Sequence, residues 1–321
     1  DVRYLAAVVV NAASDHKETA ENALAAKVPV LVEKPMTLSY IETAELIESA
    51  KLNNTLLVSS WVFMHATYID NFIKYIKDVQ EVYFYWTDEF GASRYGECKG
   101  FDSAVPIFKD VLPHVMSILS KILKSQAFEL KNCRVSRGGC YVEISIFISH
   151  VKCNLILERD SAKRRREIFI EGEKDIKLDF SNEPGTICSD DLVFSGDIYW
   201  DSSPSPLEKM VNGFLLEVNS VKTDQESIGG LALSISKLID QIEPAYLNSL
   251  DKWVMEHISK KEIEIRDIHY FVSELVRGAM KVPYNKSPEV IAWYVDVICS
   301  GQLLKNFQNT NTEVLGGNII K

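Results

Sequence analysis

The first 63 residues alternate short apolar runs with amphipathic segments, and this alternation restricts the fold more than any other feature of the chain. Three apolar runs suit strands that are buried on both faces, at residues 4–10, 28–33 and 55–63. Two helices are predicted between them, over residues 16–27 and 39–52. The links are short, and Thr37 and Ser39 are both candidate caps for the second helix. A strand-helix-strand-helix-strand series of this kind predicts a doubly wound parallel sheet of the α/β class.

The pattern changes after residue 67. An aromatic strand is predicted near residues 79–86, and five further strands follow at 130–136, 141–149, 151–158, 166–170 and 175–180. Serial strands with tight turns indicate an α+β domain with a largely antiparallel sheet. We therefore divide the chain into residues 1–67, residues 68–242, and a helical C-terminal extension over 243–321. In the aromatic strand, Tyr83 and Tyr85 share one face and Phe84 and Trp86 share the other. Both pairs are expected to form packing surface and not a binding platform.

Charge and composition exclude several classes of function. The net charge of −10 leaves no basic excess for general nucleic-acid binding. No run approaches the ~20 apolar residues of a membrane span, and no signal peptide is visible, so we expect a cytoplasmic protein. The six cysteines contain no C-x-x-C pair, and we predict no metal site.

A doubly wound nucleotide-binding fold usually opens with a glycine-rich turn that holds a pyrophosphate. The 321 residues contain no G-x-G-x-x-G sequence. We therefore expect the first half of such a domain to be absent from this sequence.

Two short polar motifs are candidates for chemistry. Glu33-Lys34-Pro35 ends the second apolar run, and it fits either a surface ion pair at a turn or the mouth of a site. Asp110-Val111-Leu112-Pro113-His114 stands at the start of a helix predicted over 110–124. Its spacing puts Asp110 and His114 one helical turn apart on one face.

Taken together, the two motifs resemble the glucose–fructose oxidoreductase / inositol dehydrogenase (Gfo/Idh/MocA) family. The resemblance extends over about residues 4–242, and its specific motifs lie within 10–40 and 110–119. It implies a partial Rossmann-type nucleotide-binding domain and NAD or NADP as the cofactor. The proline before His114 and the Ser-Ile-Leu after Met116 resemble members of the family that act on nucleotide-linked sugars.

The resemblance also implies roles for single residues. Lys34 would lie beside the nicotinamide and the reacting sugar carbon, and Glu33 would approach the nicotinamide ribose. The remaining implied cofactor-binding residues are Asn11, Ala12, His16 and Pro35. The family commonly has proline where Ala12 stands, so this loop departs from the pattern.

The chemistry of sugar oxidation fits these residue types. The reaction removes a hydride from carbon and a proton from oxygen, and a histidine with an ordinary pKa of about 6.5 can accept that proton. We predict His114 as the acid/base and Lys34 as the group that polarises the oxygen. Asp110 would orient either the histidine or the substrate.

The predicted function is an NAD(P)-dependent oxidoreductase that acts on a nucleotide-linked sugar or a polyol. Two alternatives stay open: a reductase of the same fold with a non-sugar substrate, such as an imine or tetrapyrrole, and a truncated, non-catalytic interaction module. Arg94 and Tyr95 are either substrate contacts or surface residues. A homo-oligomer, a dimer or tetramer, is expected from the broad aromatic sheet face and from the resemblance.

Overall fold

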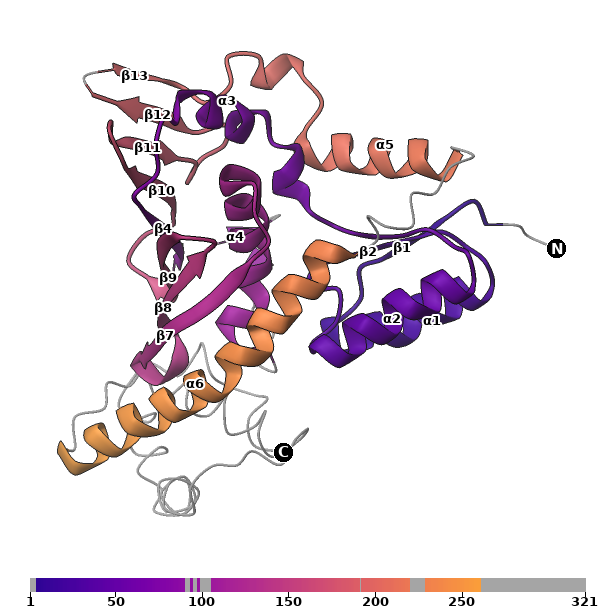
Figure 1. Cartoon of the computed structure of the whole chain (residues 1–321), viewed down its shortest axis with the longest axis horizontal. Helices are drawn as coiled ribbons and strands as arrows, with labels where there is room; N and C mark the ends of the chain where they lie inside the picture. The colour runs from indigo at the N-terminus through magenta and orange to yellow at the C-terminus, as the bar shows by residue number, and fades with distance from the viewer. Residues whose placement is uncertain are drawn as a thin grey trace.

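The chain forms a small parallel sheet and a larger mixed sheet, with helices between and around them (Figure 1). This computed structural model describes residues 4–89, 93–94, 97–98, 105–190, 192–219 and 229–260. The arrangement confirms the α/β class predicted from the sequence, with a small Rossmann-like parallel sheet followed by a mixed, largely antiparallel sheet.

The small sheet contains the three strands predicted in the first 63 residues, in the order β1-β2-β3 and all parallel. Its elements are β1 (Ala7–Val9), α1 (His16–Ala25), β2 (Val30–Val32), α2 (Tyr40–Leu52) and β3 (Leu57–Ser59). Helix α2 begins where the sequence predicts, because the Ser39 hydroxyl accepts a hydrogen bond of 3.2 Å from the backbone N–H of Glu42. Leu24 of α1 and Leu46 of α2 are fully buried against one face of the sheet.

The second face of the small sheet is covered by a helix from much later in the chain. Helix α5 (Pro206–Asn219) lies on the side opposite α1 and α2 (Figure 1). Its residues Met210 and Phe214 pack against Leu31 and Leu56. A parallel sheet needs apolar cover on both faces, so this layer combines residues from the first and second predicted domains.

The large sheet has eight strands in the order β13-β12-β11-β10-β4-β9-β8-β7. Their bounds are β4 (Glu81–Glu89), β7 (Phe128–Ser136), β8 (Tyr141–Ile148), β9 (Val151–Ser161), β10 (Arg165–Glu171), β11 (Ile176–Asp179), β12 (Thr186–Ser189) and β13 (Leu192–Ser195). Each neighbouring pair is antiparallel except β4 and β9, which run parallel in the centre. Two short strands, β5 (Ser93–Arg94) and β6 (Glu97–Cys98), pair separately.

One face of the large sheet carries the main core. Helices α3 (Thr67–Tyr75) and α4 (Ile107–Leu123) and the 3-10 turn η2 (Val62–His65) lie against it. Strand β4 shows the predicted alternation, since Phe84 and Trp86 point into this core and Tyr83 and Tyr85 are half-buried on the other face.

Helix α6 (Gly230–Lys260) runs from the small sheet to β7 at the edge of the large one (Figure 1). The boundary that we placed between residues 242 and 243 falls within this helix. Tyr246 and Leu250, beyond that boundary, are buried in the main core. The helix continues through Pro244, which is exposed. Residues 261–321 lie outside the described residues.

Candidate active site

The Glu33-Lys34-Pro35 turn lies at the carboxyl end of the small sheet, directly after β2. The backbone N–H of Glu33 donates to Val9 of β1 at 2.9 Å, which continues the ladder by one bond. The Glu33 carboxylate then accepts two hydrogen bonds, from the Lys34 N–H at 2.7 Å and from the Ser60 hydroxyl at 3.0 Å. Ligands of open α/β sheets bind at this edge, so the turn occupies the position expected for a binding site.

Lys34 reaches from this turn to the second predicted motif. Its Nζ donates to Oδ1 of Asp110 at 2.8 Å and to the main-chain oxygen of Asp110 at 2.9 Å. Asp110 lies in the first turn of α4. The positive end of the helix dipole stabilises a carboxylate at this position. The Lys34 side chain is 14% exposed and that of Asp110 is 43% exposed. The contact therefore lies at the mouth of the site, and it joins the two motifs that the sequence singled out.

A second cation, Arg159 of β9, also contacts Asp110. Its guanidinium donates to Oδ2 at 3.4 Å and to the carbonyl oxygen of Val105 at 3.2 and 3.3 Å. Burial opposes the charged form of Asp110, but the positive charges of Lys34 and Arg159 outweigh it and lower the pKa of Asp110 to about 2. Asp110 is therefore a carboxylate at neutral pH and acts as a fixed acceptor for both cations.

His114 lies one turn further along α4 and is half-buried. Its imidazole stacks on the indole of Trp86, with ring centroids 5.3 Å apart and an angle of 12° between the planes. The Phe63 ring meets the imidazole nearly at right angles, at 5.1 Å and 89°. His114 also lies near enough to Asp110 to affect its titration. The structure thus brings Lys34, Asp110 and His114 to one end of α4.

The implied cofactor-loop residues lie beside the same turn. Asn11 and Ala12 follow β1 and are exposed. His16 is only 2% exposed, so its ring does not face solvent. Its Nδ1 lies 2.8 Å from the carbonyl oxygen of Pro35, and its Nε2 lies 3.1 Å from that of Asn11. His16 therefore ties the loop after β1 to the turn after β2.

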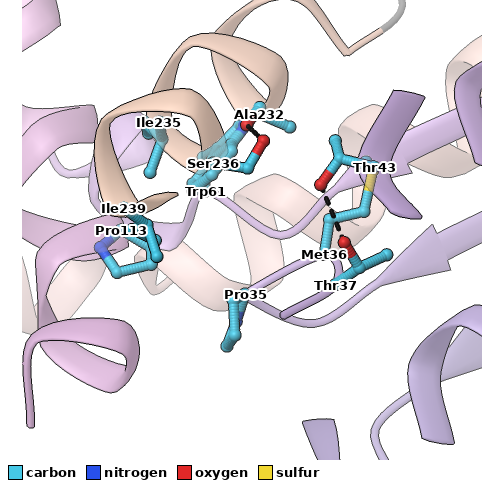
Figure 2. Close-up of a pocket in the computed structure, with 10 residues that line it drawn as sticks. All are labelled: Pro35, Met36, Thr37, Thr43, Trp61, Pro113, Ala232, Ile235, Ser236 and Ile239. Carbon is cyan, nitrogen blue, oxygen red and sulfur yellow. Dashed lines mark hydrogen bonds between the residues drawn. The ribbon is translucent and has the colours of Figure 1, made fainter. Parts of the chain in front are cut away.

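A small cavity of about 10 Å³ lies behind the two motifs, enough for one water molecule (Figure 2). Pro35 of the first motif and Pro113 of the second both line it, as Figure 2 shows. Its other walls are mostly apolar, and the hydroxyls of Thr37 and Thr43 bond to each other at 2.8 Å. The cavity is too small for a sugar or nucleotide and separates the motifs from α6.

Several residues of this site were not predicted as site residues. Arg159 directly follows the strand predicted over 151–158, and Ser60 and Phe63 fall within the strand predicted over 55–63. In the structure Ser60 follows β3, and Phe63 lies in the turn η2. Trp86 was expected only to pack, but it also contacts His114.

Arg94 falls in strand β5, whereas Tyr95 lies outside the described residues. Among the described residues, no helix combines the length and the apolar character that a membrane crossing demands.

A parallel sheet with a polar turn at its carboxyl edge, followed by a second sheet domain, is a Rossmann-type α/β architecture. Residues 2–60 match the GFO_IDH_MocA profile, described as an oxidoreductase family with an NAD-binding Rossmann fold. Over residues 2–60, this match confirms the family resemblance that the motifs predicted. A search of curated proteins finds no match.

Solved structures show the same fold over most of the chain. UDP-N-acetylglucosamine 3-dehydrogenase GnnA from Acidithiobacillus ferrooxidans is 18% identical, with a TM-score of 0.62 over 76% of this chain and 79% of that one. KijD10, a 3-ketoreductase from Actinomadura kijaniata solved with NADP and TDP-benzene, is 16% identical, with a TM-score of 0.60 over 75% and 78% of the two chains. At these identities the likeness concerns the fold.

Proposed function

We propose that this protein is an NAD(P)-dependent oxidoreductase that transfers a hydride between the nicotinamide and a carbon atom of a sugar, most specifically of a nucleotide-linked sugar or polyol. The observation that carries this proposal is the contact between Lys34, at the carboxyl edge of the parallel sheet, and Asp110, one turn before His114. Two motifs far apart in the sequence supply a cation, a carboxylate and an imidazole to one place, as the oxidation of a hydroxyl requires.

Each of these residues has a chemical role in the proposal. Lys34 donates a hydrogen bond to the reacting oxygen and stabilises the negative charge that develops on it. His114 takes the hydroxyl proton during oxidation and returns it during reduction. Asp110, a carboxylate at neutral pH, holds the Lys34 ammonium in place.

The edge of the small sheet fits the nicotinamide end of the cofactor. Glu33 is held there by Ser60, and the exposed loop at Asn11 and Ala12 lies beside it. The bound nicotinamide would supply hydride chemistry, and the protein would supply orientation. The choice between NAD and NADP follows from residues on the second strand of a complete nucleotide-binding fold, so both cofactors belong in the test.

The proposed substrate class has support from two sources. The proline before His114 and the Ser-Ile-Leu after Met116 follow the pattern of family members with nucleotide-linked sugars. Of the two structural neighbours named above, one is a UDP-N-acetylglucosamine 3-dehydrogenase and the other was solved with TDP-benzene. A nucleoside diphosphate sugar is therefore the first substrate to test.

We also propose that the protein is a homo-oligomer. The open face of the large sheet presents half-buried aromatic residues, including Tyr83, Tyr85 and Phe169. Light scattering coupled to size-exclusion chromatography measures the mass in solution, and a monomer of 36.3 kDa would contradict this part of the proposal.

Calorimetric titration with NADH and NADPH tests the function directly. It uses the 321-residue chain and the protein expressed from its complete reading frame. Binding by either form, followed by turnover of UDP-N-acetylglucosamine or another nucleotide sugar with NAD⁺ or NADP⁺, is the expected result. Failure of both forms to bind either nucleotide would overturn the proposal in favour of a non-catalytic interaction module.

A further inference from the structure

We propose that Trp86 and Phe63 are positioning residues that fix the ring plane of His114. The inference rests on the proposed function, in which the His114 imidazole carries the proton. It adds two residues that neither of the sequence motifs contains.

The geometry restrains the imidazole in two perpendicular directions. Trp86 lies parallel to the ring of His114, with 12° between the planes. Phe63 lies perpendicular to the same ring, at 89°. Phe63 and Trp86 also meet each other at 5.7 Å and 90°, so the three rings form one contact set. The preferred geometries for aromatic pairs are offset-stacked and edge-to-face, and both occur here.

The two flanking rings are themselves held by the large sheet. Trp86 is 6% exposed, and its cross-strand neighbour Arg166 lies over the indole, with Cζ 3.8 Å from a ring centroid. Arg166 in turn donates to the carbonyl oxygen of Thr87 and to Oδ1 of Asp88, both at 2.6 Å. A guanidinium with these bonds fixes the indole against the sheet.

Phe63 has a comparable support on its own side. Its ring packs edge-on against Phe180, at 5.9 Å and 70°, and Phe180 is 1% exposed. Neither flanking ring can therefore move without disturbing the main core, because interiors are packed as densely as organic crystals.

A fixed ring plane matters for proton transfer. Rotation of the imidazole about its Cβ–Cγ bond would sweep its edge into the indole and the phenyl ring. While the plane is fixed, the two ring nitrogens keep constant directions, and hydrogen bonds weaken steeply away from linearity. Catalytic groups lose much of their effect when they are displaced by about 1 Å. The rings thus align His114 for the transfer without contacting the reacting atoms.

The first test is a proton NMR spectrum of the free protein, with the His114 ring signals assigned by comparison with a His114→Gln variant. Ring currents from Trp86 and Phe63 should displace these signals from those of an exposed imidazole, with cross-relaxation to the indole protons. In the Trp86→Leu variant, the His114 ring signals should move back towards those of an exposed imidazole. A matched variant, Phe72→Leu, removes a fully buried ring of the same core from helix α3 and should leave the signals in place.

The second test separates positioning from stability. With UDP-N-acetylglucosamine and NAD⁺ or NADP⁺, Trp86→Leu should lower kcat by about 10²-fold and leave KM unchanged, and Phe72→Leu should change neither. If Trp86→Leu does not fold, Trp86→Phe, which keeps a smaller ring, should give an intermediate loss. Unchanged His114 signals and unchanged kcat in the folded Trp86 variants would overturn the proposal. So would an undisplaced His114 spectrum in the wild-type protein.

The proposed role of His114 and the positioning role of Trp86 can fail separately. If His114→Ala keeps full turnover, the proposed role of the imidazole in the reaction is wrong, whatever the Trp86 variants do. If His114→Ala abolishes turnover while Trp86→Leu keeps both kcat and the displaced signals, only the positioning inference is wrong.

Discussion

The ammonium of Lys34 donates to Oδ1 of Asp110 at 2.8 Å, across 76 residues of sequence. Lys34 belongs to the turn that closes the second strand of the small sheet, and Asp110 belongs to the first turn of α4. This bond therefore joins the small parallel sheet to the domain that carries His114.

Replacement of Lys34 by methionine should lower kcat by about 10²–10³-fold, the usual loss when one donor to a developing oxyanion is removed. The side chain keeps its length, so its packing changes little. Initial rates with a nucleotide sugar and NAD⁺ or NADP⁺ measure the effect. Lys17→Met serves as the control, because Lys17 pairs with Glu45 on the surface at 2.5 Å. Equal rates in the two variants would contradict the role of Lys34.

The stability of the protein should depend on pH through Asp110. Its pKa is lowered to about 2 in the folded state, from an ordinary value of 3.8. A carboxyl with a lowered folded pKa stabilises the fold fully above its unfolded value, and that contribution is lost as the pH falls from about 4 towards 2. Urea unfolding across this range should show a shallower pH dependence in Asp110→Asn than in wild type. An exposed residue, Asp201, provides the control variant Asp201→Asn, and identical curves for both variants would refute the prediction.

Arg159→Met should raise the pKa of Asp110, because one of its two neighbouring cations is removed. Arg159→Lys should restore part of the effect, since the charge is kept. Carbon NMR of the Asp110 carboxyl during an acid titration measures the pKa directly. The control is Arg165→Met, which removes a cation that pairs with Glu167 at 2.8 Å instead. A pKa that stays at its wild-type value in Arg159→Met would show that Lys34 alone stabilises the carboxylate.

His16→Leu should lower the free energy of unfolding by about 1–3 kcal/mol, the cost of leaving a buried polar group without its partner. The ring now bridges the carbonyl oxygens of Pro35 and Asn11. Because both oxygens belong to the proposed cofactor loops, the affinity for NADH or NADPH should fall as well. Chemical denaturation and calorimetry measure the two effects. His150→Leu, at an exposed position, should change neither, and a His16 variant that behaves like it would disprove the bridging role.

Leu250→Ala should lower the free energy of unfolding by about 2–5 kcal/mol, the usual range for a buried leucine. Leu250 is fully buried in the main core although it lies beyond residue 242. Urea unfolding measures the change, and Asn248→Ala on the exposed side of α6 is the control. A loss below 1 kcal/mol would mean that the helix beyond residue 242 is independent of the core.

Local sequence was sufficient for much of the fold. The three strands of the small sheet were predictable because each is a short apolar run that needs cover on both faces. The start of α2 was predictable because Ser39 and Glu42 interact within one turn. Asp110 and His114 were predictable as a pair because four residues make about one turn of helix.

Long-range contacts carried no comparable signal. No pattern in the sequence connects Arg159 to Asp110, or Trp86 to His114, because each pair joins different elements whose approach depends on sheet order and helix packing. The length of α6 was missed for a related reason. Pro244 is a local signal for a helix end, but the burial of Tyr246 and Leu250 outweighs that preference.

The sequence by itself determined which chemical groups this protein holds: the lysine at a strand end, and the carboxylate and imidazole one turn apart on a helix. Only the tertiary structure decided that these groups meet, and that Asp110 lies between two cations while the imidazole lies against two aromatic rings. The physical reason is range. Helix spacing and strand burial follow from neighbours in the chain, whereas pKa values and ring orientation depend on whatever groups the fold packs beside them.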